Sequence, residues 1–201
     1  MKRFDCLKSL AAILDPKAIV VANVGPISRE WNALRPSDAN LLQGNLGLCA
    51  AVGLGIAVSL SHRQVVMLDG DGNLLLNLAS LADLGNQNLA HVMHIVLDNE
   101  SYEGGGGLRS ATAGKADLAA IARGAGIPNA TVATTLEEFE TAARRGLEHP
   151  GHFFIVAKVE QGSVAKLPTL TIDGKEGKYR FARYIEATEG IEILRPRYTH
   201  I

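Results

Sequence analysis

Apolar residues recur along the chain with two different periods. Near the N-terminus, Phe4, Leu7, Leu10, Ala11 and Leu14 stand three or four residues apart, as expected for one face of an α-helix. Short runs of β-branched and other apolar residues, typical of buried strands, separate such helical segments. The pattern predicts strands over residues 18–24, 64–68, 91–97, 130–133 and 153–159, and helices over residues 4–14, 47–61, 76–84, 117–123, 135–148 and 178–186.

Two of the helical segments carry further signals. Thr135 and Glu138 have the spacing of a capping box, which predicts a helix that starts there and ends near Glu148. Residues 47–61 are small and apolar on every side, which favours a helix buried against a sheet. Glycines interrupt this stretch, and it falls short of the ~20 apolar residues that a membrane span needs.

Strands that alternate with helices predict a fold class. We expect a three-layer α/β/α arrangement with a mostly parallel central sheet and right-handed connections. A chain of 201 residues suits a single domain, residues 1–201, because either half would bury too little apolar surface. In such sheets ligands bind at the carboxyl ends of the strands. Three polar turns follow predicted strands: residues 25–28, residues 70–73, and Asp98-Asn99 leading to Gly104.

Composition and charge limit the partners. With 20 Lys and Arg against 21 Asp and Glu, the formal net charge is -1. We therefore expect no binding to nucleic acid or to an anionic membrane surface. Cys6 and Cys49 are the two cysteines, and no secretory signal pattern precedes them. This combination predicts a cytoplasmic protein without a disulfide framework or a cysteine-held cluster within the chain.

The stretch from Asp69 to Asn73 alternates acidic or amide residues with glycine. Such spacing also opens a calcium loop, but that loop needs glycine sixth and glutamate twelfth, where this chain has Leu74 and Ser80. A carboxylate at a strand end that opens a helix suits a hard cation beside a phosphate, and Asn99 could add a neutral oxygen. A plain turn rich in turn-forming residues would have the same composition.

Two other nucleotide-binding motifs do not fit the chain. The glycine tract 104–107 continues as Leu108-Arg109-Ser110, without the lysine of a P-loop. Gly53 and Gly55 fall inside a predicted helix, with Val58 where the third glycine of a dinucleotide-binding motif would stand.

Taken together, the polar turns resemble the signature of thiamin-diphosphate-dependent enzymes. Residues 70–73 followed by Asp98-Asn99 resemble the GDG motif and its strand-end asparagine pair, with Asp98 in place of the first asparagine. Residues 44–47 resemble the glycine, small, bulky apolar, glycine element of that family. Residues 102–107 and 113–123 resemble the small subunit of sulfopyruvate decarboxylase and the matching part of phosphonopyruvate decarboxylase.

The resemblance implies roles for individual residues. Mg²⁺ would be held by Asp71, by the Asn99 side chain and by the main-chain oxygen of Ser101. Leu46 would bend the cofactor into its V shape, and the Gly44 carbonyl would accept from the aminopyrimidine. The cofactor-binding set implied in this way is Gly25, Gly44, Leu46, Asp71, Gly72, Asn73, Asn99, Tyr102 and Gly104.

The resemblance also implies a missing half. In this family a glutamate on a pyrimidine-binding domain activates the cofactor, and that domain should span another ~150 residues, which this chain cannot hold. We therefore expect a partner subunit that carries this glutamate, and an assembly that is at least a dimer or a hetero-tetramer. The implied activity is that of a lyase, a two-subunit 2-oxoacid decarboxylase of the sulfopyruvate or phosphonopyruvate type.

Departures from the family pattern concern the substrate. Gly105 stands where pyruvate-type decarboxylases have an acidic residue, and residues 106–112 replace a GGQ-x-T element. Arg109 could pair with the anionic tail of a substrate through its planar fork, or be a solvated loop residue.

Three other functions stay open. The chain could belong to a carboligase of the acetolactate synthase type, to a 2-oxoacid:ferredoxin oxidoreductase, or be a catalytically silent cofactor-binding subunit. The oxidoreductases often read GDGD, whereas Asn73 follows Gly72 here.

Overall fold

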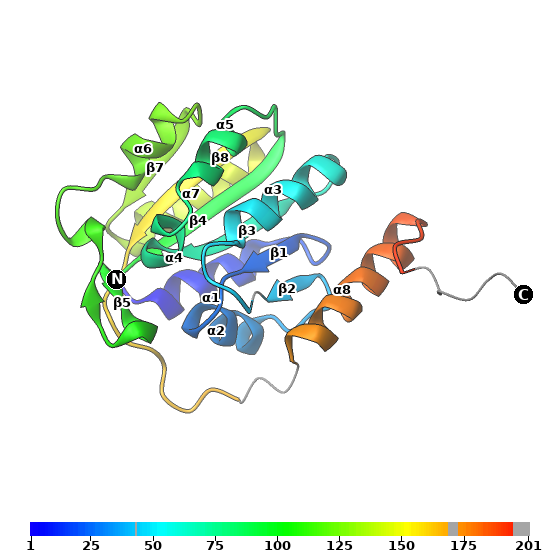
Figure 1. Cartoon of the computed structure of the whole chain (residues 1–201), viewed down its shortest axis with the longest axis horizontal. Helices are drawn as coiled ribbons and strands as arrows, with labels where there is room; N and C mark the ends of the chain where they lie inside the picture. Colours follow the sequence, from blue (N-terminus) through cyan, green and yellow to red (C-terminus); the bar gives the residue numbers. More distant parts are fainter. Residues whose placement is uncertain (43, 169–172, 195–201) are drawn as a thin grey trace, which may run out of the picture.

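The central feature of the fold is a six-stranded parallel sheet (Figure 1). The structure is a computed structural model of the chain and describes residues 1–42, 44–168 and 173–194. In spatial order the strands are β2 (Asn40–Leu42), β1 (Ile19–Ala22), β3 (Val65–Gly70), β4 (His91–Asp98), β8 (Gly151–Lys158) and β7 (Asn129–Ala133). All five pairings between neighbours are parallel.

Helices cover both faces of this sheet, because the strands carry apolar residues toward each side. One face packs against α1 (Arg3–Ile13), α2 (Pro26–Leu34) and α7 (Leu136–Glu148), which contribute the buried side chains Leu10, Trp31 and Phe139. The opposite face is covered by α3 (Cys49–Ser59), α4 (Asp71–Leu75), α5 (Ala79–Gly85) and α6 (Leu118–Gly124). The predicted three-layer α/β/α class is confirmed.

Most predicted elements are present, within a few residues of their predicted ends. The capping box is confirmed: the Thr135 hydroxyl accepts from the Glu138 N–H, and the Glu138 carboxylate accepts from the Thr135 N–H. The turn predicted at residues 70–73 is not present. Strand β3 runs to Gly70, and α4 begins directly with Asp71.

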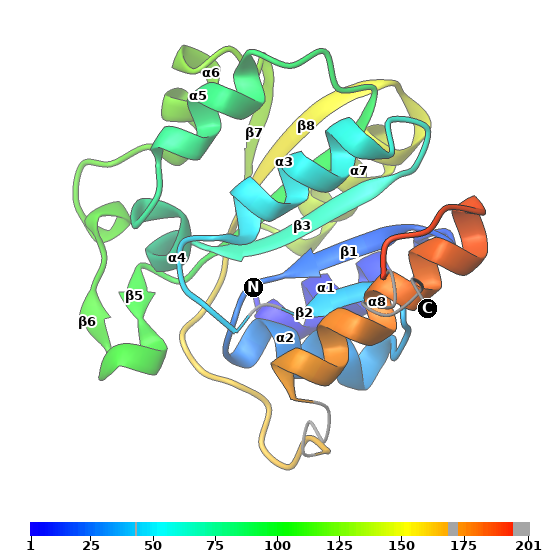
Figure 2. The same ribbon diagram turned by 45° about the vertical axis from the view of Figure 1, so that its right-hand side comes forward.

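The structure contains several short helices and strands that were not predicted. Pro26, predicted to lie in a turn, occupies the first turn of α2, where a missing N–H costs no hydrogen bond. The three-residue strand β2 is too short to show a period. A small antiparallel hairpin, β5 (Ser101–Tyr102) and β6 (Leu108–Arg109), lies beside α4 (Figure 2). Short 3-10 helices, η1 (Glu103–Gly105) and η2 (Ala111–Ala113), follow its two strands.

Helix α3 was predicted to be buried on all sides, but only one of its sides is buried. Its buried residues are Cys49, Ala50, Gly53 and Ala57, and a side chain at Gly53 would overlap Met67 of β3. The other side is open to solvent in this chain, with Val58 53% exposed. The apolar residues on all sides of α3 therefore include one face that this chain does not cover. Among the described residues, no helix is long and apolar enough to cross a lipid bilayer.

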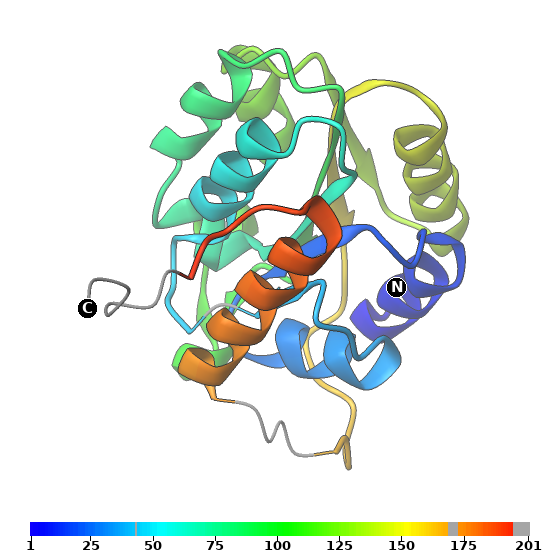
Figure 3. The same ribbon diagram turned by 90° about the vertical axis from the view of Figure 1, so that its right-hand side faces the viewer.

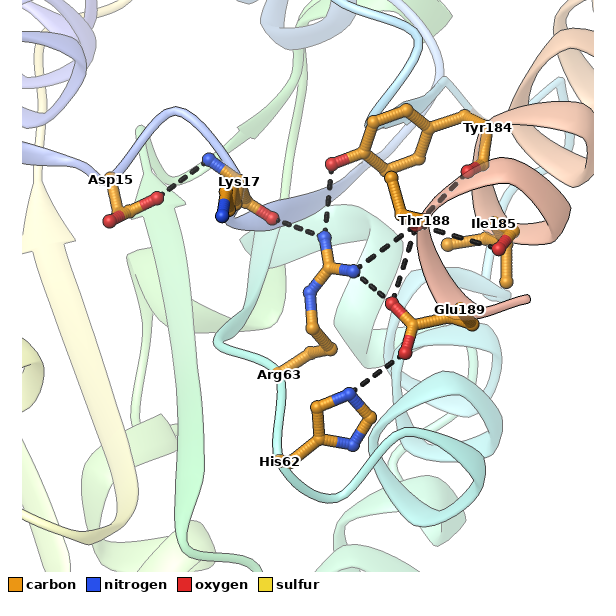
Figure 4. Close-up of polar contacts among 8 residues, drawn as sticks. All are labelled: Asp15, Lys17, His62, Arg63, Tyr184, Ile185, Thr188 and Glu189. Atoms are coloured by element: carbon orange, nitrogen blue, oxygen red, sulfur yellow. Dashed lines mark hydrogen bonds and ion pairs between the residues drawn. The ribbon is translucent and has the colours of Figure 1, made fainter.

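The C-terminal helix α8 (Gly174–Glu189) lies across the β2 edge of the sheet (Figure 3). Phe181, Tyr184 and Ile185 of this helix pack against the apolar cluster of the α3 face. Its last turn is tied to the loop before β3 through Arg63 (Figure 4). The Arg63 guanidinium pairs with Glu189, and donates to the Tyr184 hydroxyl at 3.0 Å and to the Lys17 carbonyl at 2.6 Å.

We expect Arg63→Ala to loosen α8, because the largely buried Arg63 guanidinium, in the α3–β3 loop, joins this helix to the segment before β1. The thermal midpoint should fall by about 2–4 °C, which corresponds to about 1 kcal/mol in a chain of this size. Hydrogen exchange in residues 180–189 should speed up. The control is Arg183→Ala, which removes an exposed pair with Glu186 within the same helix. Equal effects of the two changes would contradict this assignment.

Candidate functional site

A cavity of about 550 Å³ opens at the carboxyl ends of β1, β3 and β4. Its walls are drawn from residues 23–27, 44–46, 70–73 and 97–105, together with Arg3. The three polar segments that follow β1, β3 and β4 thus lie around one cavity at this edge of the sheet. The lining includes every residue of the predicted cofactor and metal set: Gly25, Gly44, Leu46, Asp71, Gly72, Asn73, Asn99, Ser101, Tyr102 and Gly104.

Asp71 is the acidic group at the floor of this cavity. It begins α4 and is 2% exposed. Its Oδ2 accepts a hydrogen bond from the Ser110 hydroxyl, and the Thr112 hydroxyl lies 3.3 Å away. Burial raises the pKa of the Asp71 carboxyl, and the nearby charge of Asp98 raises it further. A bound cation would offset both effects, so the site is suited to a positive ion.

Asn99 and Ser101 supply further oxygens next to Asp71. The Asn99 Oδ1 accepts from the Ser101 N–H at 3.1 Å, which leaves its second lone pair available. The Ser101 hydroxyl is buried and has no hydrogen-bond partner. One carboxylate, one amide oxygen and main-chain oxygens form a hard donor set that fits Mg²⁺. Within the described residues, no group of three His, Cys, Asp or Glu side chains could hold a metal ion.

The glycines of this cavity let the backbone approach a ligand. A Cβ at Gly72 would lie 2.6 Å from two ring carbons of Tyr102, so a side chain does not fit there. A Cβ at Gly44 or Gly104 would meet nothing within 4 Å. The first N–H groups of a helix have no backbone partner within the helix and can donate to an anion. In α4, the Gly72 N–H also lies against the Asp71 carboxylate. The residues present therefore fit a diphosphate next to Mg²⁺.

Leu46 projects into the cavity from a loop that is fixed by hydrogen bonds. It is 59% exposed and lines the cavity, so its side chain is available to a ligand. The backbone of the next residue, Gly47, is held at both of its polar groups. Its N–H donates to Asn73 Oδ1 at 2.6 Å, and its carbonyl accepts from Asn77 Nδ2 at 2.9 Å. Asn73 also donates to buried Asp69.

No role was predicted for Asp69, for Asn77 or for the Asn73 side chain. These three residues stand four positions apart along the chain, and this spacing is the sequence feature that could have indicated a shared role.

Two arginines, Arg109 and Arg3, are candidates to contact an anionic substrate, and they differ in their position relative to the cavity. Arg109 is exposed on β6, and its guanidinium donates to the Ala113 carbonyl at 2.6 Å. It is not among the residues that line the cavity. Arg3 does line it, is 5% exposed, and pairs with Glu30 and Glu103. Burial lowers the pKa of the Arg3 guanidinium, but the hydrogen bonds to these two carboxylates outweigh it and raise the pKa. Nothing in the sequence around Arg3 indicates a role, because its burial and its two carboxylate partners appear only in the folded chain.

A parallel α/β sheet with a cavity at the carboxyl ends of its strands is the usual arrangement of an α/β ligand-binding domain. The family described as "Thiamine pyrophosphate enzyme, C-terminal TPP binding domain" matches residues 31–157. The chain belongs to this family, and its cofactor is thiamin diphosphate.

Curated relatives agree with this assignment. The chain is 31% identical to sulfopyruvate decarboxylase subunit beta of Methanocaldococcus jannaschii, over 92% of this chain and 97% of the relative. It is 34% identical to a phosphonopyruvate decarboxylase of Streptomyces hygroscopicus, over 93% of this chain but 46% of that protein. The chain thus spans about half the length of the second relative and nearly all of the first.

Solved structures share the fold. Benzoylformate decarboxylase from Polynucleobacter necessarius superposes with a TM-score of 0.66 at 21% identity, covering 85% of this chain and 34% of that one. A thiamin diphosphate-dependent enzyme from Mycobacterium smegmatis, described as putative, gives a TM-score of 0.66 at 20% identity, over 81% of this chain and 32% of that one.

We expect Gly72→Ala to weaken binding of thiamin diphosphate, because the new methyl group would push the Tyr102 ring or the start of α4 into the cavity. Overpacking of this kind typically costs about 1–3 kcal/mol. Calorimetry measures the loss of cofactor affinity, and thermal unfolding measures the loss of stability. Gly124→Ala is a matched control in α6, where a Cβ would meet nothing within 4 Å. Wild-type affinity in the Gly72 variant would contradict the close approach.

Proposed function

We propose that the chain is the small, diphosphate-binding subunit of a two-subunit, Mg²⁺-dependent 2-oxoacid decarboxylase of the sulfopyruvate or phosphonopyruvate type. Three observations support the proposal. The chain belongs to a thiamin diphosphate-binding family, and relatives of nearly equal length are named as beta subunits of sulfopyruvate decarboxylase. The observation that carries it is the gathering of the whole predicted set around one cavity.

In this proposal the chain's own residues bind and orient the cofactor. Asp71, the Asn99 amide oxygen and the Ser101 main-chain oxygen would hold Mg²⁺, and backbone N–H groups of α4 would face the diphosphate. Leu46 would hold the two rings at an angle by packing, because a branched apolar side chain restricts a flexible ligand without forming bonds. Bound thiamin diphosphate supplies the carbanion chemistry at its thiazolium ring.

The partner subunit would complete the site. Around Gly47, three leucines are exposed: Leu46 at 59%, Leu48 at 39% and Leu76 at 57%. A Cβ at Gly47 would lie 3.4 Å from the Leu76 Cβ, so Leu76 lies against the loop that carries Leu46 and Leu48, and we treat the three leucines as one apolar patch. Patches of this kind mark interfaces. We infer that the pyrimidine-binding subunit covers this patch and brings the activating glutamate, in a dimer or a two-plus-two tetramer.

An anionic substrate tail also needs a cation. Arg3 is committed to two carboxylates. We propose Arg109 for this contact, because its exposed guanidinium lies on the hairpin that begins at the cavity wall.

We expect Asp71→Ala to abolish Mg²⁺-dependent binding of thiamin diphosphate while the chain stays folded. A site with few protein ligands cannot replace a lost carboxylate. Calorimetric titration with and without Mg²⁺ measures this, and circular dichroism checks the fold. Ser9→Ala, a change remote from the cavity, serves as the control. Unchanged cofactor affinity in the Asp71 variant would refute the metal assignment.

We expect Leu46→Ala to lower turnover of the assembled enzyme more than cofactor affinity, since the diphosphate anchors binding while the bend aligns the reacting groups. The control is Leu108→Ala, which is 70% exposed and does not line the cavity. Equal losses of turnover and affinity would point to simple damage of the loop.

We expect the chain alone to release no CO₂ from sulfopyruvate or phosphonopyruvate with Mg²⁺ and thiamin diphosphate. Adding the partner subunit should restore turnover, and cofactor binding and assembly should stabilise each other by mass action. Activity of the lone chain that survives further purification would overturn the half-site proposal.

A further inference from the structure

Glu103 contacts the Asn99 side chain at the wall of the cavity. The Asn99 Nδ2 donates to Glu103 Oε2 at 3.1 Å, while its Oδ1 accepts from the Ser101 N–H. A carboxylate can only accept here and a backbone N–H can only donate, so the two partners fix which end of the amide is oxygen. The Asn99 oxygen is thereby held in one orientation.

Glu103 is itself held by two segments that are distant in the sequence. The Arg3 guanidinium at the start of α1 donates to Glu103 Oε2 at 2.9 Å. The Gly162 N–H, in the loop after β8, donates to Glu103 Oε1 at 2.7 Å. Both oxygens of this carboxylate are therefore engaged, and Glu103 is not free to rotate toward a metal ion.

Arg3 is anchored on its other side by Glu30 of α2. Its Nε and Nη2 atoms donate to the two Glu30 oxygens at 2.9 and 3.0 Å, in a forked pair. Glu30 is 1% exposed, so water does not compete for this pair. The Arg3 Nη2 atom also donates to the Gly162 carbonyl at 2.9 Å. The chain of contacts from Glu30 through Arg3 and Glu103 thus ends on Asn99.

We propose that Glu103 is a positioning residue for the metal site, which orients the Asn99 amide oxygen toward Mg²⁺ and is kept in place by Arg3 and Gly162. This inference rests on the proposed function, because it takes Asn99 as a metal ligand. A carboxylate that accepts from the amide N–H also polarises the amide and makes its oxygen a better ligand. Without Glu103, only the Ser101 N–H would select the orientation, and the flipped amide would present N–H groups to the cation.

The test measures the Mg²⁺ concentration that half-saturates binding of thiamin diphosphate, by calorimetry on the chain assembled with its partner subunit. Glu103→Ala should raise this concentration by about 10–100-fold, the usual effect of removing a partner of a metal ligand. Excess Mg²⁺ should restore cofactor affinity. Glu103→Gln should show a smaller rise, because one oxygen remains to accept from Asn99. Arg3→Lys keeps the charge but loses the fork, and should shift the value in the same direction.

Two comparisons make the result decisive. Glu160→Ala changes a 65% exposed carboxylate of the neighbouring loop, and should leave the Mg²⁺ requirement unchanged. Asp71→Ala reports separately on the metal site. If Asp71→Ala abolishes Mg²⁺-dependent binding but Glu103→Ala and Arg3→Lys leave the half-saturating concentration unchanged, the role of Glu103 is refuted while the proposed function stands. If Asp71→Ala also has no effect, the metal assignment fails, and the inference fails with it.

Discussion

The parallel register of β1, β3 and β4 is the constraint on which the site depends. Ala22 pairs with Leu68, and Gly70 pairs with Leu97, so the three strands end at nearly the same level. Residues that follow these strands must then meet at one edge. The glycine turn after β1, Asp71 and Asn99 come together for this reason, although up to 74 positions separate them in the 201-residue chain.

The sheet and the cavity could be predicted because their signals are local. Strand runs such as residues 92–97 are buried on both faces, so composition alone identifies them. Asp71 and Asn99 stand directly after such runs, and the topology of parallel sheets then places them. By contrast, β2 has three residues and β5 has two, too few for any period.

The polar networks around the cavity could not be predicted in the same way. Arg3 and Glu103 are 100 positions apart, and nothing in either local sequence distinguishes them from surface charges. Their pairing follows from how α1 and the loop after β8 pack beside the cavity, which is a tertiary effect. The same holds for the uncovered side of α3: an apolar pattern shows that a face avoids water, but it does not show whether the chain itself covers that face.

The central claim is that this cavity holds the diphosphate half of thiamin diphosphate through a divalent cation. Anomalous diffraction from crystals of the assembled subunits, grown with thiamin diphosphate and Mn²⁺ in place of Mg²⁺, tests it most directly. The account predicts one manganese peak bonded to Asp71, to the Asn99 amide oxygen and to the Ser101 carbonyl, with the diphosphate beside α4 and Leu46 between the two rings. Manganese and diphosphate bound elsewhere, or bound in the cavity without Asp71 and Asn99, would contradict it.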